Sequence, residues 1–362
     1  MFDWESILGS ASRDFGGALR LFAYALLGAL ALCDSAWCAE EESAKERIAA
    51  LTREVGALRR SGGLYDPRQY ALLNQLADLH SLQGDIDEAL AALAYIERIS
   101  EHTDGRQSTL HAGTLARIAD WHCRLGRFDS GRQRFRRSIE RLRHAGGDQL
   151  IGALLGLARC SFAELAAEGV VTSAVSLDYY RGPVLRTNRM SVGSPTFHYR
   201  VQKILRPDAE QALRYAAQLA ETGTMQPERR VQVLVQVGDW FQAKDHSRTA
   251  RRYYASAQRW VQRTVAADDP LAAPVQVLYP VPPRALHTSP LSEPSAAQRY
   301  VEVEFTVRAD GRIDRERVVT RDPGKSAADE TLQALQAARY RPRMMDGEAL
   351  ETEGVRFRQA FK

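Results

Sequence analysis

Near its C-terminal end the chain reads Tyr300-Val-Glu-Val-Glu-Phe-Thr-Val307, then Arg308-Ala-Asp-Gly-Arg312, and later Arg339-Tyr-Arg-Pro-Arg343. In the first run, apolar residues alternate with Glu and Thr, which is typical of a strand with one buried and one wet face. Asp310-Gly311 follows directly, and glycine accepts the positive φ that a tight turn requires. Together with the β-branched run at residues 313–320, this pattern predicts a β-hairpin.

A helix and a third strand are predicted after the hairpin. Ser326-Ala-Ala-Asp329 has the form of a capping box, so we expect Ser326 to cap a helix, and Leu332 and Leu335 continue at helical spacing. The final run, Val355-Arg-Phe-Arg-Gln-Ala-Phe361, predicts another strand. Hairpin, helix and strand together predict a small α+β domain.

These residues resemble the C-terminal domain of the TonB family. The resemblance covers residues 276–362 and is carried by Asp310-Gly-Arg312, Arg339-Tyr-Arg-Pro342 and Asp346-Gly347, which stand in the family's order. Tyr279-Pro280 is similar to the segment that leads into the family's domain.

The resemblance implies a protein partner. Domains of this family grip an extended segment of an outer-membrane transporter by adding it as a strand to a sheet edge, where backbone N–H and C=O groups are open. The partner-binding residues implied here are Tyr279, Pro280, Val355, Arg356, Phe357, Arg358, Gln359, Ala360 and Phe361. From the fold alone, the alternative remains that the last strand only closes the sheet.

Residues 41–262 have helical periodicity and a repeated pattern. Three copies align on small residues and on a turn residue, namely Ala89, Gly131 and Ala250, and Gly84, Gly126 and Asp245. This segment resembles the tetratricopeptide repeat, in which stacked helix pairs form an α-solenoid with a groove. The predicted fold class is therefore multidomain and mainly α, with a tetratricopeptide-like solenoid followed by the small α+β domain.

Two stretches interrupt this pattern. Residues 171–205 lose the helical periodicity, which predicts an irregular insertion that is either functional or mobile. Residues 266–298 are rich in proline and are expected to form a stiff, extended linker.

The start of the chain is typical of a targeting segment. Arg13 and Arg20 precede an apolar run at residues 21–32, and Ala36-Trp-Cys38 provides a cleavage site before Ala39. We interpret residues 1–38 as a signal peptide, which predicts a periplasmic protein. The alternative is an uncleaved inner-membrane anchor with the rest of the chain facing the periplasm.

Cys123 and Cys160 lie outside this segment and occupy the same position of successive repeats. An oxidising periplasm permits a disulfide between them if their Cα atoms come within about 7 Å. The alternative is a pair of buried, small hydrophobic side chains.

No catalytic or metal-binding constellation is evident. The sequence has no phosphate loop, no G-x-S-x-G motif and no paired cysteine motif with metal spacing, so we expect no enzyme activity, no cofactor and no metal. His80 and His122 align with Phe241 in the repeats and are interpreted as packing rings. A net charge of +4 with interspersed signs gives no case for nucleic-acid binding.

Two arginine clusters are interpreted as solvated. The run Arg132-Gln-Arg-Phe-Arg-Arg137 is expected to form an exposed helix face. Arg339, Arg341 and Arg343 are expected to flank the sheet in water, with an anion site as the alternative.

The sequence as a whole predicts a non-enzymatic periplasmic protein that binds proteins through the TonB-like domain and a groove of the helical repeats. The partners expected are outer-membrane transporter segments or envelope proteins, with a membrane involved only if residues 1–38 stay attached. One alternative is an inner-membrane-anchored energy transducer of the TonB type, although no long Pro/Lys-rich spacer is present. Another is an envelope assembly scaffold that acts through the repeats.

Overall fold

The computed structural model describes residues 43–171, 195–223, 225–263, 269–282 and 299–361. The expected signal segment, residues 1–38, lies outside the described residues. Contacts within the chain divide it into two compact units, one up to residue 96 and one from residue 97 to residue 362.

The first unit is helical. It contains a helix whose described part spans residues 43–62, followed by α2 (Gln69–Gln83) and most of α3 (Ile86–Thr103). Leu51 and Val55 are buried, as expected for one apolar face of the first helix. Gly84, between α2 and α3, has a φ of 84°, so the turn uses the left-handed conformation that glycine adopts readily.

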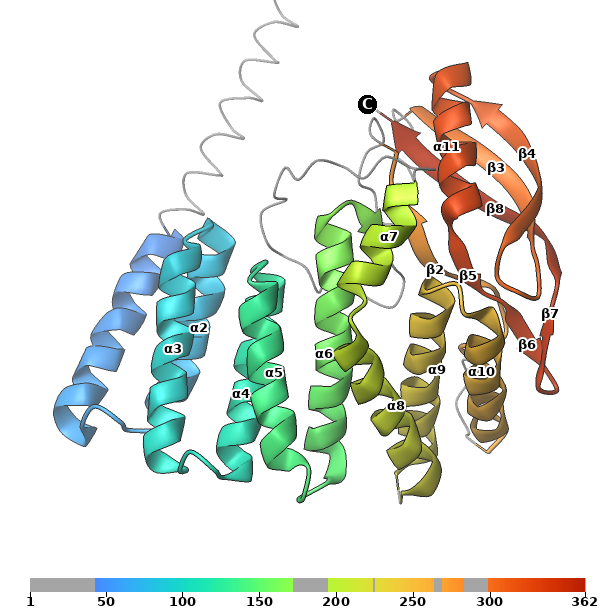
Figure 1. The fold of residues 1–362 in the computed structure, drawn as a ribbon. Helices are drawn as coiled ribbons and strands as arrows, with labels where there is room; N and C mark the ends of the chain where they lie inside the picture. The colour runs from blue at the N-terminus through green and yellow to red at the C-terminus, as the bar shows by residue number, and fades with distance from the viewer. Residues whose placement is uncertain (1–42, 172–194, 224, 264–268, 283–298, 362) are drawn as a thin grey trace, which may run out of the picture. The chain divides into compact units, whose positions relative to one another are not determined.

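The helices of the second unit after α3 are α4 (Thr109–Arg124), α5 (Phe128–Leu142), α6 (Gly147–Ala167), α7 (Pro195–Ile204), α8 (Pro207–Thr222), α9 (Pro227–Ala243) and α10 (Ser247–Val261) (Figure 1). The side chain of Ser108 accepts a hydrogen bond from the backbone N–H of His111 and so caps α4. Proline occupies the first turn of α8 and of α9, where its missing N–H costs nothing.

The small residues of the repeat lie where helices cross closely. A Cβ atom on Gly131 of α5 would lie 2.3 Å from the Sγ atom of Cys123 on α4. A Cβ atom on Gly238 of α9 would lie 2.2 Å from the ring of Tyr254 on α10. Because no real side chain fits at such distances, these helix pairs require glycine, and the second unit contains the predicted tetratricopeptide-like packing.

Helix α6 forms the centre of the helical core. By length and composition it could cross a membrane, but 72% of its most apolar window is buried inside the protein. Its buried face contacts α4, α5 and α8, which explains its apolar sequence as that of a core helix.

The expectation that residues 171–205 are irregular is wrong at their C-terminal end. Residues 195–204 form α7, and Phe197, Val201 and Ile204 are buried at helical spacing. A helix of ten residues contains too few apolar positions for its period to stand out in sequence. Residues 172–194 lie outside the described part of the chain.

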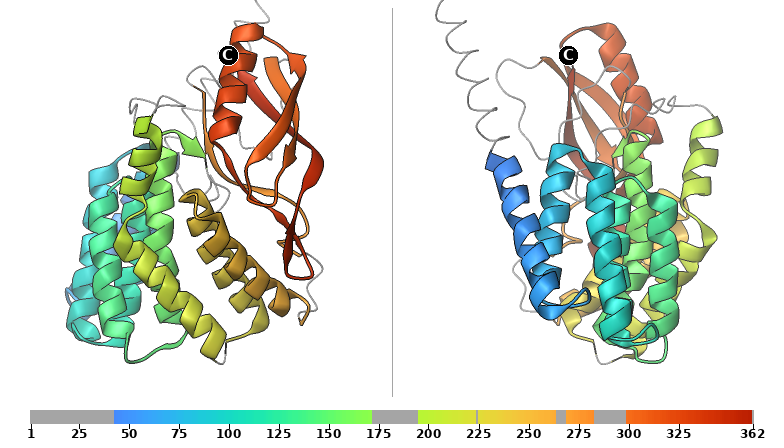
Figure 2. Two further views of the ribbon diagram at one scale, coloured as in Figure 1. Left: turned by 45° about the vertical axis from the view of Figure 1, so that its right-hand side comes forward. Right: turned by 90° about the vertical axis from the view of Figure 1, so that its left-hand side faces the viewer.

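Within the described residues, the sheet region comprises α11 (Lys325–Ala337) and eight strands, of which β1 comes from the end of the helical part, namely β1 (Val170–Val171), β2 (Val275–Pro280), β3 (Arg299–Val307), β4 (Ile313–Arg321), β5 (Arg339–Arg341), β6 (Arg343–Met345), β7 (Glu348–Leu350) and β8 (Thr352–Phe361). These strands form three antiparallel sheets in the orders β4-β3-β8, β1-β2-β5 and β6-β7. The predicted hairpin is β3 and β4, and the predicted last strand is β8. Helix α11 contacts β3 and β4 (Figure 2), and Val301, Val303, Phe305 and Val307 of β3 are buried as expected. The other face of β3 is not the wet face predicted, since Glu302 and Thr306 are also buried, and Glu302 pairs with arginines of β8.

Two details of this region differ from expectation. The N-cap of α11 is Gly324 and not Ser326, because the helix already begins at Lys325. Residues 271–281 do not form a linker, since Leu271, Val277 and Leu278 are almost fully buried and β2 pairs with β1 and β5. The short run Val275-Gln-Val-Leu-Tyr279 is apolar enough to enter the core between prolines.

His122 is a buried packing ring, as its place in the repeat predicts. Its side chain is 8% exposed, and its Nδ1 atom has no hydrogen-bond partner in the described part of the chain. Burial, and then the positive charges of Arg134 and Arg127, lower the pKa of His122 to about 4. In the unfolded chain a histidine has a pKa near 6.5, so the unfolded state binds more protons between these two values.

Stability should therefore fall as the pH falls from about 6.5 to about 4, and His122→Phe should weaken this dependence. Between pH 7.5 and pH 5 the native chain should lose free energy of unfolding through His122. We expect the variant to lose about 2 kcal/mol less over the same range. Urea unfolding at both pH values measures the difference. The exposed His144 provides the control, since His144→Phe should behave like the native chain; an unchanged pH dependence in His122→Phe would contradict the assignment.

Candidate functional site

Strand β8 lies at one border of its sheet. It pairs with β3 in antiparallel register, with Val303 opposite Phe357 and Phe305 opposite Val355. Within the described residues, the sheet order β4-β3-β8 places no further strand beside β8. Since a strand pairs through both of its sides, the sheet can be extended on this side of β8, as it can at β4 on the opposite border.

The two faces of β8 differ in chemistry. Val355 and Phe357 are half-buried and pack against the hydrophobic core. On the other face, Arg356 reaches Glu304 at 3.2 Å, and Arg358 reaches Glu302 at 3.5 Å. Both arginines are exposed, so a chain placed along β8 would meet two guanidinium groups that already pair with glutamates of β3, next to two half-buried apolar side chains.

The structure brings the predicted leading segment to β8. The ring centroid of Tyr279 lies 4.8 Å from that of Phe357, and the Tyr279 hydroxyl donates to Oε1 of Gln359 at 3.2 Å. Burial raises the pKa of Tyr279 well above its usual value, which keeps this hydroxyl a donor. The remaining predicted residues are also buried, namely Pro280, Gln359, Ala360 and Phe361. Their side chains build the core, so Val355 to Arg358 form the accessible part of the predicted set.

A second polar cluster, which sequence reasoning missed, joins the sheet region to the helical repeats. The guanidinium of Arg341 in β5 donates two hydrogen bonds to the carboxylate of Asp239 in α9, at 2.9 and 2.6 Å. It donates a third to the backbone oxygen of Pro270 at 2.9 Å, and Asp239 also accepts from the Tyr254 hydroxyl. Burial by itself would lower the pKa of Arg341, but the charge and hydrogen bonds of Asp239 raise it above its ordinary value.

Asp245, in the turn between α9 and α10, holds two further arginines of the sheet region. Its carboxylate accepts from Arg339 at 2.9 Å and from Arg312 at 2.7 Å. Burial alone would raise the pKa of Asp245, but these two arginines hold it below its usual value. Asp245 has a φ of 64°, in the position where the other repeats have Gly84 and Gly126. Aspartate is one of the non-glycine residues that adopt this conformation most readily, and here its carboxylate also pairs with the two arginines.

The tight turn of the β3-β4 hairpin also packs against α9. Gln242 donates to the backbone oxygen of Asp310 at 2.8 Å, and the N–H of Tyr340 donates to the oxygen of Gly311 at 2.8 Å. With a φ of 80°, Gly311 has no room for a side chain, since a Cβ atom would lie 2.1 Å from the Tyr340 oxygen. The Asp-Gly-Arg motif therefore forms the turn of the hairpin and also contacts α9 of the repeats.

The expectation that Arg339, Arg341 and Arg343 all flank the sheet in water is wrong for two of them. Arg339 is 5% exposed and Arg341 is 7% exposed, whereas Arg343 is exposed as expected. Arg132 on α5, expected on a solvated face, is also buried at 1% exposed. Arg339 and Arg341 are neutralised by carboxylates distant in sequence, of which the local stretch gives no sign. Arg132 pairs with the distant Glu164 and also with Asp129 in the same helix.

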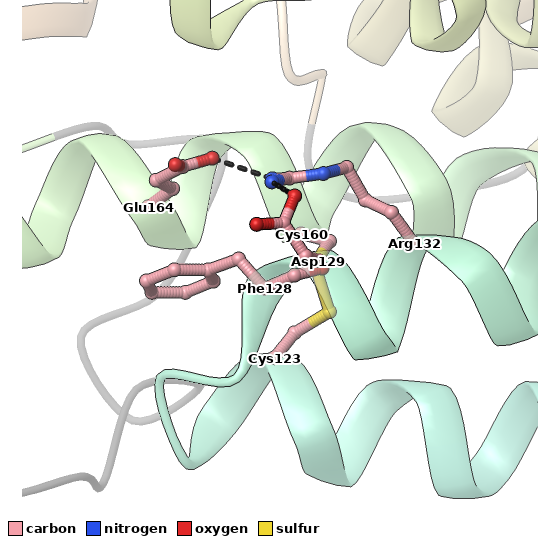
Figure 3. The surroundings of a disulfide bond; sticks show 6 residues. All are labelled: Cys123, Phe128, Asp129, Arg132, Cys160 and Glu164. Atoms are coloured by element: carbon pink, nitrogen blue, oxygen red, sulfur yellow. Dashed lines mark hydrogen bonds and ion pairs between the residues drawn. A yellow bond between two sulfur atoms is a disulfide. The ribbon is translucent and has the colours of Figure 1, made fainter.

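The structure joins Cys123 and Cys160 by a disulfide, with their Cα atoms 5.3 Å apart. This bond links α4 to α6, and its two cysteines occupy the same position in successive repeats. Figure 3 shows the guanidinium of Arg132 beside it, between Asp129 at 2.7 Å and Glu164 at 2.5 Å. Covalent and ionic links thus hold α4, α5 and α6 together at the same place.

The described residues contain no group of three or more His, Cys, Asp or Glu side chains that could hold a metal ion. The polar clusters above consist of ion pairs whose members neutralise one another.

Comparison with known families supports the assignment of the sheet region. Residues 295–362 match the family described as Gram-negative bacterial TonB protein C-terminal. This segment is TonB C-terminal-like. It contains β3, β4, α11 and β5 to β8, and hence the TonB motifs whose arginines bind the repeats. No curated protein matches the chain at a significant level.

Solved structures that are similar to the chain include the following two. The nearly identical TPR-like repeats assigned to a kinesin light chain of Podosopora anserina have a TM-score of 0.43 and 13% identity, with 63% of this chain and 92% of that chain covered. BtubC (BKLC) from P. vanneervenii has a TM-score of 0.37 and 14% identity, with 70% of this chain and 96% of that chain covered.

The contact between the TonB C-terminal-like segment and the repeats should depend on the buried ion pair. We expect Arg341→Met to lower the free energy of unfolding by about 3 to 5 kcal/mol, because Asp239 would stay buried without its cation. Adding Asp239→Asn should restore part of this loss, since the remaining buried group is then neutral. Denaturant unfolding of the single and double variants measures both effects.

The exposed Arg343, two residues away in the same motif, is the matched control, and Arg343→Met should change the free energy of unfolding by less than about 0.5 kcal/mol. Equal effects at positions 341 and 343 would show that the buried pair does not hold the two regions together.

Proposed function

We propose that the chain is a non-enzymatic, periplasmic protein that binds other envelope proteins and presents β8 to an extended segment of a partner. The observation that carries this proposal is the place of β8 at the sheet border, with pairing to β3 on one side. A visiting strand gains backbone hydrogen bonds there, and alternate side chains give selectivity. At Val355 to Arg358 the selecting groups are two half-buried apolar side chains and two arginines.

The helical repeats are proposed as a second binding element, and also as the part of the protein that holds the domain containing β8 in place. Arg312, Arg339 and Arg341 of the TonB motifs are all paired with aspartates of the last repeat. A domain held in this way suits a scaffold or adaptor better than a transducer whose C-terminal domain moves at the end of a long spacer.

The disulfide supports a periplasmic location. Disulfides persist in oxidising compartments and are rare in the reducing cytosol. The Cys123–Cys160 bond, together with the expected signal peptide, favours export of the chain.

A photo-crosslinking amino acid at Phe357 tests the β8 proposal in living cells. A benzophenone side chain keeps an aromatic ring at this position, so the core contact with Tyr279 should persist. We expect one envelope protein to be captured, with the crosslink mapped by mass spectrometry to a single short segment.

The control places the same amino acid at Val319, an exposed position on β4 at the opposite border of the sheet. Capture of the same proteins from both positions, or of cytosolic proteins alone, would rule out specific binding at β8.

Export is tested by the mass of the protein recovered from the periplasmic fraction. We expect a mature chain that begins at Ala39 and that gains two thiol-alkylation adducts only after reduction, because Cys123 and Cys160 are the cysteines left after cleavage. Recovery of the uncleaved chain from the inner membrane would favour an anchored protein instead.

A further inference from the structure

Helix α10 carries an unusual stripe of positive charge. Arg248, Arg251, Arg252 and Arg259 lie on α10, Arg263 follows just after it, and residues 247–263 contain no Asp or Glu. All five arginines are exposed. At about 100° per residue they fall within a sector of about 120° on one side of the helix.

These arginines differ from the others in how they are neutralised. On α5, Arg132, Arg134 and Arg136 each have a carboxylate partner. In the described part of the chain, no carboxylate lies within 4.0 Å of any of the five arginines of the stripe. Arg259 donates only to the hydroxyl of Ser256, and the guanidinium of Arg263 lies over the ring of Trp260.

The stripe is unfavourable for the helix itself. Like charges three or four residues apart repel one another, as at Arg248 and Arg252 or at Arg259 and Arg263. Arg248 also lies in the first turn, where the helix dipole disfavours a cation. An anionic partner would relieve both effects.

A groove runs beside the stripe. It has a volume of about 680 Å³ and is lined by α10, by the end of α8 and by the turn of the β6-β7 hairpin, through Glu221, Arg252, Ala255, Ser256, Gln258, Arg259, Gln262, Asp346 and Gly347. The N–H of Gly347 donates to Oε1 of Gln258 at 2.7 Å, which holds the hairpin turn against α10. The groove therefore has arginines on the α10 wall and two acids, Glu221 and Asp346, on the walls facing it.

We propose that the stripe and its groove bind an acidic, extended segment of a partner protein, whose carboxylates pair with Arg248, Arg252 and Arg259. These three residues span about 16 Å along the helix at 1.5 Å per residue, the length of about five residues of an extended chain. A chain can enter the groove and keep its carboxylates on the arginine side. A flat layer of lipid phosphates would instead press against Glu221 and Asp346. This inference rests on the proposed protein-binding function and assigns it a second surface.

The test measures binding of a fluorescein-labelled, glutamate-rich dodecapeptide to the full chain by fluorescence anisotropy in low salt. Combined substitution of Arg248, Arg252 and Arg259 by Gln should weaken binding about tenfold. Asp346→Asn removes an opposing acid and should tighten binding about twofold; asparagine tolerates the positive φ of 52° at this position. Binding to the native chain should weaken as salt is raised, since the groups are exposed.

The matched control removes exposed arginines from α5 and its C-cap with Arg137→Gln and Arg143→Gln, and circular dichroism confirms that each variant is folded. Similar affinities of the triple variant and the control would overturn the proposal. So would binding to vesicles containing anionic phospholipid but not to the peptide. Because none of these substitutions touches β8, failure here leaves the crosslinking result at Phe357 as a separate test of the proposed function.

Discussion

The buried pair of Arg341 and Asp239 is the constraint around which the C-terminal half is arranged. Either charge alone would be costly at this depth, so α9 and β5 have to stay together once the chain has folded. The neighbouring contacts follow from this fixed point. The hairpin turn meets Gln242, Arg339 reaches Asp245, and the β6-β7 turn meets α10. Residues 97–362 accordingly form one compact unit, although their sequence changes character near residue 270.

This arrangement gives the TonB motifs a structural role inside this chain. Arg339 and Arg341, which the sequence assigns to solvent or to an anion site, pair with aspartates of the protein's own last repeat. The sheet border at β8 and the stripe on α10, the two surfaces proposed for binding, belong to the same unit. A partner that engaged both would meet them at a fixed separation, as expected for an adaptor.

The parts that could be predicted from sequence are those set by short-range patterns. The alternation from Val301 to Val307 and the Asp310-Gly311 turn identified the hairpin, because strand period and turn conformation are local properties. The column of small residues that contains Gly131 likewise identified a close helix crossing. The ion pairs of Arg339 and Arg341 were missed, because their partners stand 94 and 102 residues earlier and no local pattern encodes such a distance. The cap of α11 was misplaced because Ser326 and Gly324 both fit a helix start, and only the backbone distinguishes them.

The aspartate at position 245 has a consequence for the interpretation of other sequences. Earlier turns of the array place glycine at this point, and aspartate fits the same turn while adding a carboxylate that glycine lacks. Its presence makes sense when a following domain supplies arginines to meet it. A repeat protein in which the last turn glycine is replaced by aspartate, with a basic motif further downstream, is thus a candidate for the same fused architecture, and this substitution is visible before any coordinates exist.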